Sequence, residues 1–294
     1  MRSYLLVLLM LIVVPSMAGQ TKRALLVGIS SYGQTGPNSW TAIHGANDVD
    51  LISPTLKKQG FKVTMLQNKN ATAARIRKAL ASLISSVRPG DMVYLHFSCH
   101  GQPFEDLDGD EEDGWDESII PYDAQLTYRR GIYEGANHIK DDELHNYIDK
   151  MRKAVGPKGY VCVVIDACHA GSASRGEDEF EDENEETFVR GVKKPFSPNG
   201  KQFRPRINAK GHFRITQHKG YSDIVILEAC RSYQSNYEIK QSGKYFGPLS
   251  YYVNLVLSKQ RLTRGTDWVL EVNKRMSADK RLARQNMVYE TSLE

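Results

Sequence analysis

The sequence predicts an α/β fold, a three-layer αβα sandwich around a mostly parallel sheet. Short apolar runs rich in β-branched residues alternate along the chain with segments whose apolar residues recur at helical spacing. Several of the short runs are apolar on both faces, as expected of strands that are covered by helices on both sides of a sheet. In such sheets, binding sites lie beyond the carboxyl ends of the strands. Residues that directly follow a strand are therefore the first candidates for chemistry.

The elements follow one another in chain order. We expect strands at residues 23–29, 61–66, 91–97, 160–167, 223–229 and 287–289. We expect helices at residues 47–59, 72–87, 141–151, 251–259 and 268–284. Gly60 follows the first of these helices and Pro89-Gly90 the second, and both signals are typical of helix C-termini.

The composition is that of an ordinary globular protein. The 294 residues are 40% hydrophobic and 25% charged, with a formal net charge of +4, which excludes a collagen-like or wholly disordered chain. The charge is too small to indicate a nucleic-acid partner. Four cysteines are too few for a disulfide scaffold. Each lies in or just after an apolar run, so we expect free buried thiols at Cys99, Cys162, Cys168 and Cys230.

Residues 1–18 have the pattern of a signal peptide. Arg2 precedes an apolar run over residues 4–14, and Ser16 and Ala18 have the small-residue spacing that signal peptidase requires. The run is too short to span a bilayer. We therefore expect an exported protein, secreted or periplasmic, without stable membrane insertion.

Two charged segments interrupt the alternation of strands and helices. Residues 105–123 contain ten acidic and no basic residues. Residues 172–220 form a long polar insert, with eight acids at 177–186 and nine basic residues and no acid at 190–219. We expect an exposed insert that divides one domain into residues 19–171 and 221–294.

Two strands end in residues suited to nucleophilic catalysis. Residues 98–101 read SCHG, and residues 166–171 read DACHAG. If the strands are neighbours, His100 and Cys168 face one crevice, as a Cys–His pair requires. The backbone N–H groups of Gly101 and Cys168 would then line an oxyanion hole. A packed cysteine and an unrelated histidine at a strand end form the alternative interpretation.

Four motifs together resemble one known family. SCHG, DGDEEDGWDESIIPYD, IKDDELHNYI and VVIDACHAG occur in this order, and they resemble the metacaspases of the caspase-like cysteine peptidase clan. The resemblance runs from about residue 22 to residue 289, interrupted by the insert. It implies a caspase/haemoglobinase fold with a six-stranded sheet, a His100–Cys168 dyad, protein or peptide substrates cleaved after Arg or Lys, and frequent activation by calcium.

The resemblance also assigns a substrate pocket. It implies that Asp48, Ser98 and Asp166 surround the side chain that precedes the scissile bond, the P1 side chain. Two acids in a partly desolvated pocket attract a cationic P1 residue and repel an acidic one. Each acid also has a purely structural alternative. Asp48 could be an acid in the first turn of a helix, and Asp166 could cap the N-terminus of a nearby helix.

The acidic segment at residues 105–123 is a candidate for calcium binding, because hard cations prefer carboxylate ligands. DLDGDEEDGWD lacks the glycine that an EF-hand needs at its sixth position. The resemblance instead implies a calcium site at Asp116, Asp141 and Asp142. The chain has Arg175 where the family places another ligand. A calcium-independent peptidase similar to clostripain or gingipain therefore stays open.

The insert suggests self-processing. An Arg- or Lys-specific peptidase would find exposed cleavage sites there, and we take Arg175, Arg190, Lys193 and Lys194 as candidates. We expect a monomer and no nucleic-acid binding, because the acids next to the basic stretch would repel phosphate. A catalytically silent binding module that retains the fold is the alternative from another functional class.

Overall fold

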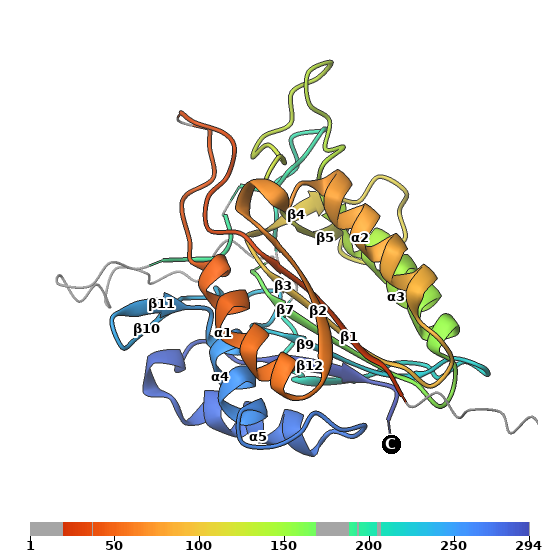
Figure 1. The fold of residues 1–294 in the computed structure, drawn as a ribbon. Coiled ribbons are helices and arrows are strands. Elements are labelled where there is room, and N and C mark those ends of the chain that lie inside the picture. The colour runs from red at the N-terminus through yellow and green to blue at the C-terminus, as the bar shows by residue number, and fades with distance from the viewer. Residues whose placement is uncertain (1–19, 37, 169–187, 193, 205–206, 294) are drawn as a thin grey trace, which may run out of the picture.

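The computed structural model describes residues 20–36, 38–168, 188–192, 194–204 and 207–293. Its centre is a seven-stranded sheet in the order β2-β1-β3-β7-β9-β12-β8 (Figure 1). The strands are β1 (Lys22–Gly28), β2 (Phe61–Gln67), β3 (Met92–Ser98), β7 (Tyr160–Asp166), β8 (His212–Arg214), β9 (Asp223–Glu228) and β12 (Val288–Thr291). Strands β2, β1, β3, β7 and β9 are parallel, and β12 is antiparallel to β9. The expected 1–18 leader lies outside the described residues.

Helices cover both faces of this sheet. α1 (Gly45–Lys58), α4 (Pro248–Leu257) and α5 (Asp267–Ala278) pack on one face, and α2 (Ala73–Ser86) and α3 (Asp141–Val155) on the other (Figure 1). The described residues also include the short 3-10 helices η1 (Asn68–Asn70) and η3 (Lys280–Leu282). The predicted αβα class and mostly parallel sheet are confirmed. Within the part of the chain that is described, no helix is long and apolar enough to cross a membrane.

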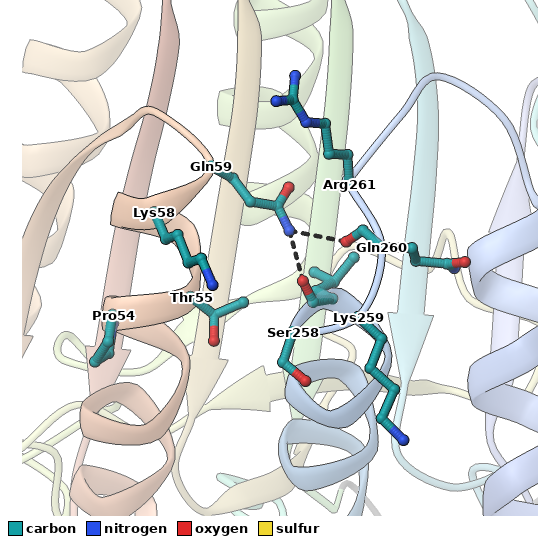
Figure 2. A pocket seen from close by; sticks show the side chains of 9 residues that line it. Pro54, Thr55, Lys58, Gln59, Ser258, Lys259, Gln260 and Arg261 are labelled. Carbon is teal, nitrogen blue, oxygen red and sulfur yellow. Dashed lines mark hydrogen bonds between the residues drawn. The ribbon is translucent and has the colours of Figure 1, made fainter.

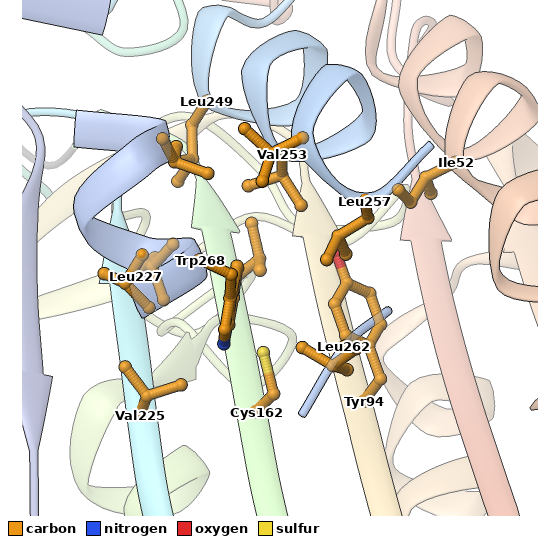
Figure 3. Packing of buried hydrophobic residues seen from close by; sticks show 14 of the residues in the cluster. Ile52, Tyr94, Cys162, Val225, Leu227, Leu249, Val253, Leu257, Leu262 and Trp268 are labelled. Atoms are coloured by element: carbon orange, nitrogen blue, oxygen red, sulfur yellow. The ribbon is translucent and has the colours of Figure 1, made fainter. Parts of the chain in front are cut away.

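Each helix layer buries a continuous apolar cluster against the sheet. Figure 3 shows Trp268 of α5 lying over β7, beside Cys162, with Leu227 of β9 and Tyr94 of β3 around it. Trp268 is 2% exposed, so its large surface contributes strongly to the hydrophobic free energy of folding. All four cysteines are free and buried, as the sequence predicts.

Smaller strands lie outside the main sheet. β4 (Gly101–Glu105), β5 (Trp115–Ile119) and β6 (Ile139–Lys140) form an antiparallel sheet that continues from the end of β3. β10 (Ile239–Gln241) and β11 (Lys244–Phe246) form a hairpin before α4. None of these short strands is predicted from the sequence, because they are polar or only two to five residues long.

The structure corrects two expectations. The main sheet has a seventh strand, β8, which comes from the insert and pairs with β12. The insert is also not exposed throughout: most of its described residues from 199 onwards are exposed, but the described residues before them include buried ones. Arg190 and Phe196 are both fully buried, since residues 188–192 and 194–196 cross the edge of the sheet at which the parallel strands end.

Candidate active site

The ends of β3 and β7 bring His100 and Cys168 to one edge of the sheet. The two strands are direct neighbours, and their register places Ser98 opposite Asp166. His100 and Cys168 each follow two residues later, and both are fully buried. His100 and Cys168 therefore lie at the same edge of the sheet, as predicted, and the chain's own residues 190 and 191 pack against it.

The backbone of Arg190 lies against both predicted oxyanion donors. The Cys168 N–H donates to the Arg190 carbonyl oxygen at 2.8 Å, and the Gly101 N–H donates to the same oxygen at 3.4 Å. A carbonyl in this position has the environment that stabilises an oxyanion in acyl transfer. The next residue, Gly191, passes so close to the thiol that a Cβ there would lie 3.2 Å from Cys168 Sγ.

His100 is held as a neutral imidazole. Its Nε2 lies 2.9 Å from the Thr41 carbonyl oxygen, which can only accept, so the proton is on Nε2. The ring stacks on Trp40 at a centroid distance of 5.1 Å. Burial lowers the pKa of His100 to about 4. Nδ1 is buried and has no hydrogen-bond partner among the described residues, so its lone pair is available for a proton.

The side chain of Arg190 fills the predicted substrate pocket. Its Nη1 lies 2.7 Å from Asp48 Oδ2, 2.7 Å from Ser98 Oγ and 3.4 Å from Asp166 Oδ1. The structure thus brings together all three predicted pocket residues. The processing prediction placed Arg190 in an exposed insert, and this is wrong. The guanidinium is buried because the carboxylates in the pocket compensate for its lost hydration.

The electrostatics of the pocket favour a cation. The pKa of Asp48 is raised to about 7, because burial and the nearby charge of Asp166 raise it by more than Arg190 lowers it. Burial alone would lower the pKa of Arg190, but Asp48, Asp166 and Glu238 outweigh it and hold that pKa above its usual value. The Gly247 N–H and Ser98 hydroxyl also donate to Asp48. The groups in direct contact with the Asp48 carboxylate are all donors, so we assign the ionised form in this arrangement.

Two residues on the far side of the pocket, Asn236 and Glu238, were not predicted from the sequence. Glu238 Oε1 accepts from Arg190 Nε and Nη2 at 3.0 and 2.8 Å. The Asn236 side chain donates to Asp166 Oδ1 at 2.7 Å. These residues belong to an irregular segment, in which the only signal was an acid between apolar positions in NYEI.

The segment that ends at Arg190 pairs with residues 236–238 in the way that an added β-strand would. The Arg190 N–H donates to the Asn236 carbonyl at 3.0 Å, and the Glu238 N–H donates to the Phe188 carbonyl at 2.9 Å. Val189 forms an antiparallel bridge with Tyr237. Extended peptides are commonly recognised by pairing with a strand in this way.

The three predicted calcium ligands also lie together. One carboxylate oxygen from each of Asp116, Asp141 and Asp142 is within 4.8 Å of the others. Asp116 is fully buried, and its Oδ1 has no partner among the described residues. Lys140, which was not among the predicted residues, also belongs to this cluster, and its Nζ lies 2.7 Å from Asp116 Oδ2. The site thus already contains one positive charge.

Of the remaining processing candidates, only Lys194 lies within the described residues. Lys194 is exposed, four residues after Arg190. Arg175 and Lys193 lie outside the described residues. Arg190 is the described candidate whose backbone contacts Cys168.

A separate hollow lies at the opposite edge of the sheet. It is lined by the last turns of α1 and α4, with Lys58 and Arg261 at its sides, and Gln59 Nε2 donates to the carbonyls of Leu257 and Gln260 within it (Figure 2). α1 begins at the edge that carries Cys168, so its last turn is remote from that residue. This hollow does not belong to the candidate site.

Curated metacaspases are among the proteins to which this chain is similar in sequence. Metacaspase-1B of Aspergillus fumigatus is 37% identical over 163 residues, which make up 52% of this chain and 36% of that protein. Metacaspase-1 of Ajellomyces capsulatus is 35% identical over 163 residues, 41% of its length. The chain therefore spans well under half of these curated relatives.

Two further comparisons cover nearly the whole chain. A crystal structure of a Geobacter sulfurreducens protein matches 92% of this chain and 93% of its own, with a TM-score of 0.60 and 19% identity, a likeness of fold alone. The family model of the caspase domain matches residues 21–293. The chain therefore belongs to the caspase domain family of peptidases.

Proposed function

We propose that the chain is a cysteine endopeptidase that cleaves after Arg or Lys, with His100 and Cys168 as its catalytic dyad. One observation carries this proposal: the Arg190 carbonyl accepts from the Cys168 and Gly101 N–H groups while its side chain is bound by Asp48, Ser98 and Asp166. Backbone and side chain together adopt the placement expected of a P1 residue. Family membership supports the same reaction class.

The reaction follows from this geometry. Cys168 Sγ attacks the carbonyl carbon of the P1 residue, and His100 Nδ1 accepts the thiol proton. The carbonyl oxygen takes up negative charge between the two N–H donors. His100 then protonates the leaving amide nitrogen, the C–N bond breaks, and a thioester remains. Water, deprotonated by His100, hydrolyses the thioester and releases the carboxylate and the free thiol.

The first substrate would be the chain's own bond between Arg190 and Gly191. Cys168→Ala should abolish both this cleavage and the hydrolysis of Arg- or Lys-terminated fluorogenic peptides, by at least about 1,000-fold. Cys230→Ala is the matched control, because Cys230 is also a buried free thiol beside Cys168. Unchanged peptide hydrolysis in Cys168→Ala would contradict the assignment and favour the silent binding module.

Processing in the insert extends the proposal. Arg190→Ala should remain intact at position 190 when the purified protein is analysed by intact mass. Cleavage after Arg175, Lys193 or Lys194 would then appear as separate fragment masses. An active wild-type chain that is never cut would contradict self-processing while leaving peptide hydrolysis standing.

Calcium binding is a further part of the proposal. The unpartnered Asp116 Oδ1 and the nearby carboxylates of Asp141 and Asp142 fit a hard cation, and these three residues would hold it. A bound calcium ion would neutralise the acidic cluster between β5 and α3. Calcium chloride should raise the melting temperature of Cys168→Ala protein, while magnesium chloride serves as the control. No shift with either salt would contradict the site.

Lys140 favours the calcium-independent alternative. Its ammonium is 2.7 Å from Asp116 Oδ2 and 3.8 Å from Asp142 Oδ2, and it supplies positive charge without a metal. Peptide hydrolysis in excess chelator separates the two candidates. Full activity there supports an enzyme similar to clostripain or gingipain, whereas lost activity that calcium restores supports the metacaspase type.

We also propose that residues 1–18 direct export and are then removed. The apolar run and the small residues at positions 16 and 18 support this proposal. N-terminal sequencing of protein recovered from outside the cytoplasm should begin at Gly19. Intact residues 1–18 on that protein would contradict it.

A further inference from the structure

The pocket around Arg190 has acids on two different edges of the guanidinium group. Asp48 and Asp166 contact Nη1. Glu238 lies on the opposite edge, where its Oε1 accepts from Nε at 3.0 Å and from Nη2 at 2.8 Å. The Glu238 side chain is fully buried. Both edges of the bound group are therefore matched by carboxylates.

A lysine side chain cannot make the same contacts. Counted from the backbone, lysine has its Cε methylene where arginine has Nε–H, and its single ammonium nitrogen stands where arginine has Cζ. The ammonium can still approach Asp48 and Asp166, but a methylene then faces Glu238. A buried carboxylate that loses its donors in this way lowers the binding free energy.

His44 fixes the position of Glu238. The His44 backbone N–H donates to Glu238 Oε1 at 2.7 Å, and its Nδ1 lies 2.6 Å from Oε2. Because a carboxylate only accepts, Nδ1 carries the proton. The imidazole stacks on Tyr245 and meets Phe188 edge-on. These contacts therefore hold the Glu238 carboxylate in a fixed position before a substrate binds. In that position it can accept from two N–H groups of an arginine side chain at once.

We propose that Glu238, positioned by His44, makes the site selective for arginine over lysine at P1. The inference rests on the proposed function, because it takes Arg190 as an occupant equivalent to a P1 residue. It goes beyond that function by separating two substrates that Asp48, Ser98 and Asp166 would accept alike.

A double-mutant cycle in the full-length chain tests the contact directly. The four proteins are wild type, Arg190→Lys, Glu238→Gln and the double variant, and intact mass follows the fragment that ends at residue 190. We expect Arg190→Lys and Glu238→Gln each to slow its formation by about 30- to 100-fold. In the lysine background, Glu238→Gln should change the rate by less than about threefold, because the contact is already lost.

Peptide hydrolysis in trans provides a second measurement. Wild type, assayed with calcium chloride present, should cleave an Arg peptide with a kcat/KM at least about 10-fold above that of the matched Lys peptide. In Glu238→Gln this ratio should fall to about one while Lys hydrolysis is retained, which also shows that the variant folds. Glu271→Gln, an acid on the outer surface of α5 paired with Arg275, should keep the wild-type ratio.

His44 has its own test as a positioning residue. His44→Asn retains a side-chain N–H close to the place of Nδ1 and should preserve the Arg:Lys ratio. His44→Phe keeps the ring packing but cannot donate, and should lower the ratio towards that of Glu238→Gln. A purely structural role would predict that both variants change activity on the two peptides equally.

The outcomes distinguish a failure of the selectivity proposal from a failure of the proposed peptidase function. Equal cleavage of Arg and Lys peptides by wild type, or an equal loss on both in Glu238→Gln, would overturn the selectivity proposal and leave the peptidase standing. A wild-type protein that cuts neither peptide and leaves its own chain intact would instead contradict the proposed function, and the selectivity proposal with it.

Discussion

At the scale of single residues, His96 links the core to the substrate pocket. Its Nδ1 faces the Tyr94 hydroxyl at 3.0 Å, and its Nε2 faces Ser250 Oγ at 2.9 Å. The Ser250 hydroxyl donates to Asp166 Oδ2 at 2.7 Å, so His96 donates to Ser250 and accepts from Tyr94. Every group in this buried chain has a partner, which fixes the carboxylate of Asp166 beneath the pocket.

This network predicts a specific loss of stability in acid. Burial lowers the pKa of His96 to about 4, so the unfolded chain binds its proton at a higher pH than the folded protein. The contribution of His96 is fully present above about pH 6.5 and is lost as the pH falls towards 4, by up to about 3 kcal/mol. In a Cys168→Ala background, His96→Gln should be less stable at pH 7.5 but should lose less stability between pH 6.5 and 4.5. Urea denaturation at these pH values measures both effects.

The exposed His145 provides the control for this experiment. His145→Gln should follow the pH dependence of the parent protein. If His96→Gln and the parent lose stability in parallel between pH 6.5 and 4.5, the buried histidine is not the group that titrates.

The residues of the pocket differ in how far the sequence could predict them. Asp48, Ser98 and Asp166 were assigned to the pocket by the family resemblance, and Ser98 and Asp166 also stand at the ends of two predicted strands. Glu238 and Lys140 are charged residues whose importance depends on which distant segment they meet: Glu238 lies 48 positions from Arg190. Such contacts depend on the path of irregular segments, which hydrophobic periodicity does not determine.

At the scale of elements, the close approach of α1 to the sheet determines where Asp48 lies in the pocket. A Cβ on Gly45 would lie 2.2 Å from the Ser98 carbonyl oxygen and 2.7 Å from the Ile29 carbonyl oxygen. The absence of a side chain lets the first turn of α1 contact the ends of β1 and β3. Asp48, one turn later, therefore reaches Ser98 and Arg190.

Gly45→Ala should consequently disturb both stability and the pocket. The added methyl group meets backbone atoms that cannot move independently, so we expect a loss of about 2–3 kcal/mol in the free energy of unfolding and slower cleavage at Arg190. Gly211→Ala is the control, because a Cβ there meets no atom closer than 3.8 Å. Urea denaturation compares the two variants, and equal stability of both would show that α1 can shift without cost.

The main elements were predictable because their patterns are long. Strands β1, β3, β7 and β9 are continuous apolar runs, and α1, α2 and α3 have amphipathic spacing over fourteen or fifteen residues. β4, β5 and β8 were not predicted, since β4 contains Pro103 and β8 has only three residues with exposed ends. Pairing with an existing strand, rather than local propensity, creates such elements.

At the scale of the whole molecule, the segment after Arg190 holds the two parts of the domain together. Phe196 is fully buried against Phe104 of β4, with ring centroids 4.8 Å apart. β8 then pairs with β12 at the edge of the sheet. β9 inserts between β7 and β12, so the residues before and after the insert share one sheet.

This architecture predicts that cleavage at Arg190 does not separate the chain. The fragment from Gly191 onwards supplies β8, β9, β12, α4 and α5, and its apolar residues form one core with those of β1, β3 and β7. Separation would expose this core to water. The free energy needed for that exposure is far larger than the stability lost when one peptide bond in a buried segment is cut. Protein cut at position 190 should therefore elute from a size-exclusion column at the volume of uncut Cys168→Ala protein, and show two fragments only under denaturing conditions. Native elution of two separate species would mean that the bond between Arg190 and Gly191 is itself required to hold the sheet together.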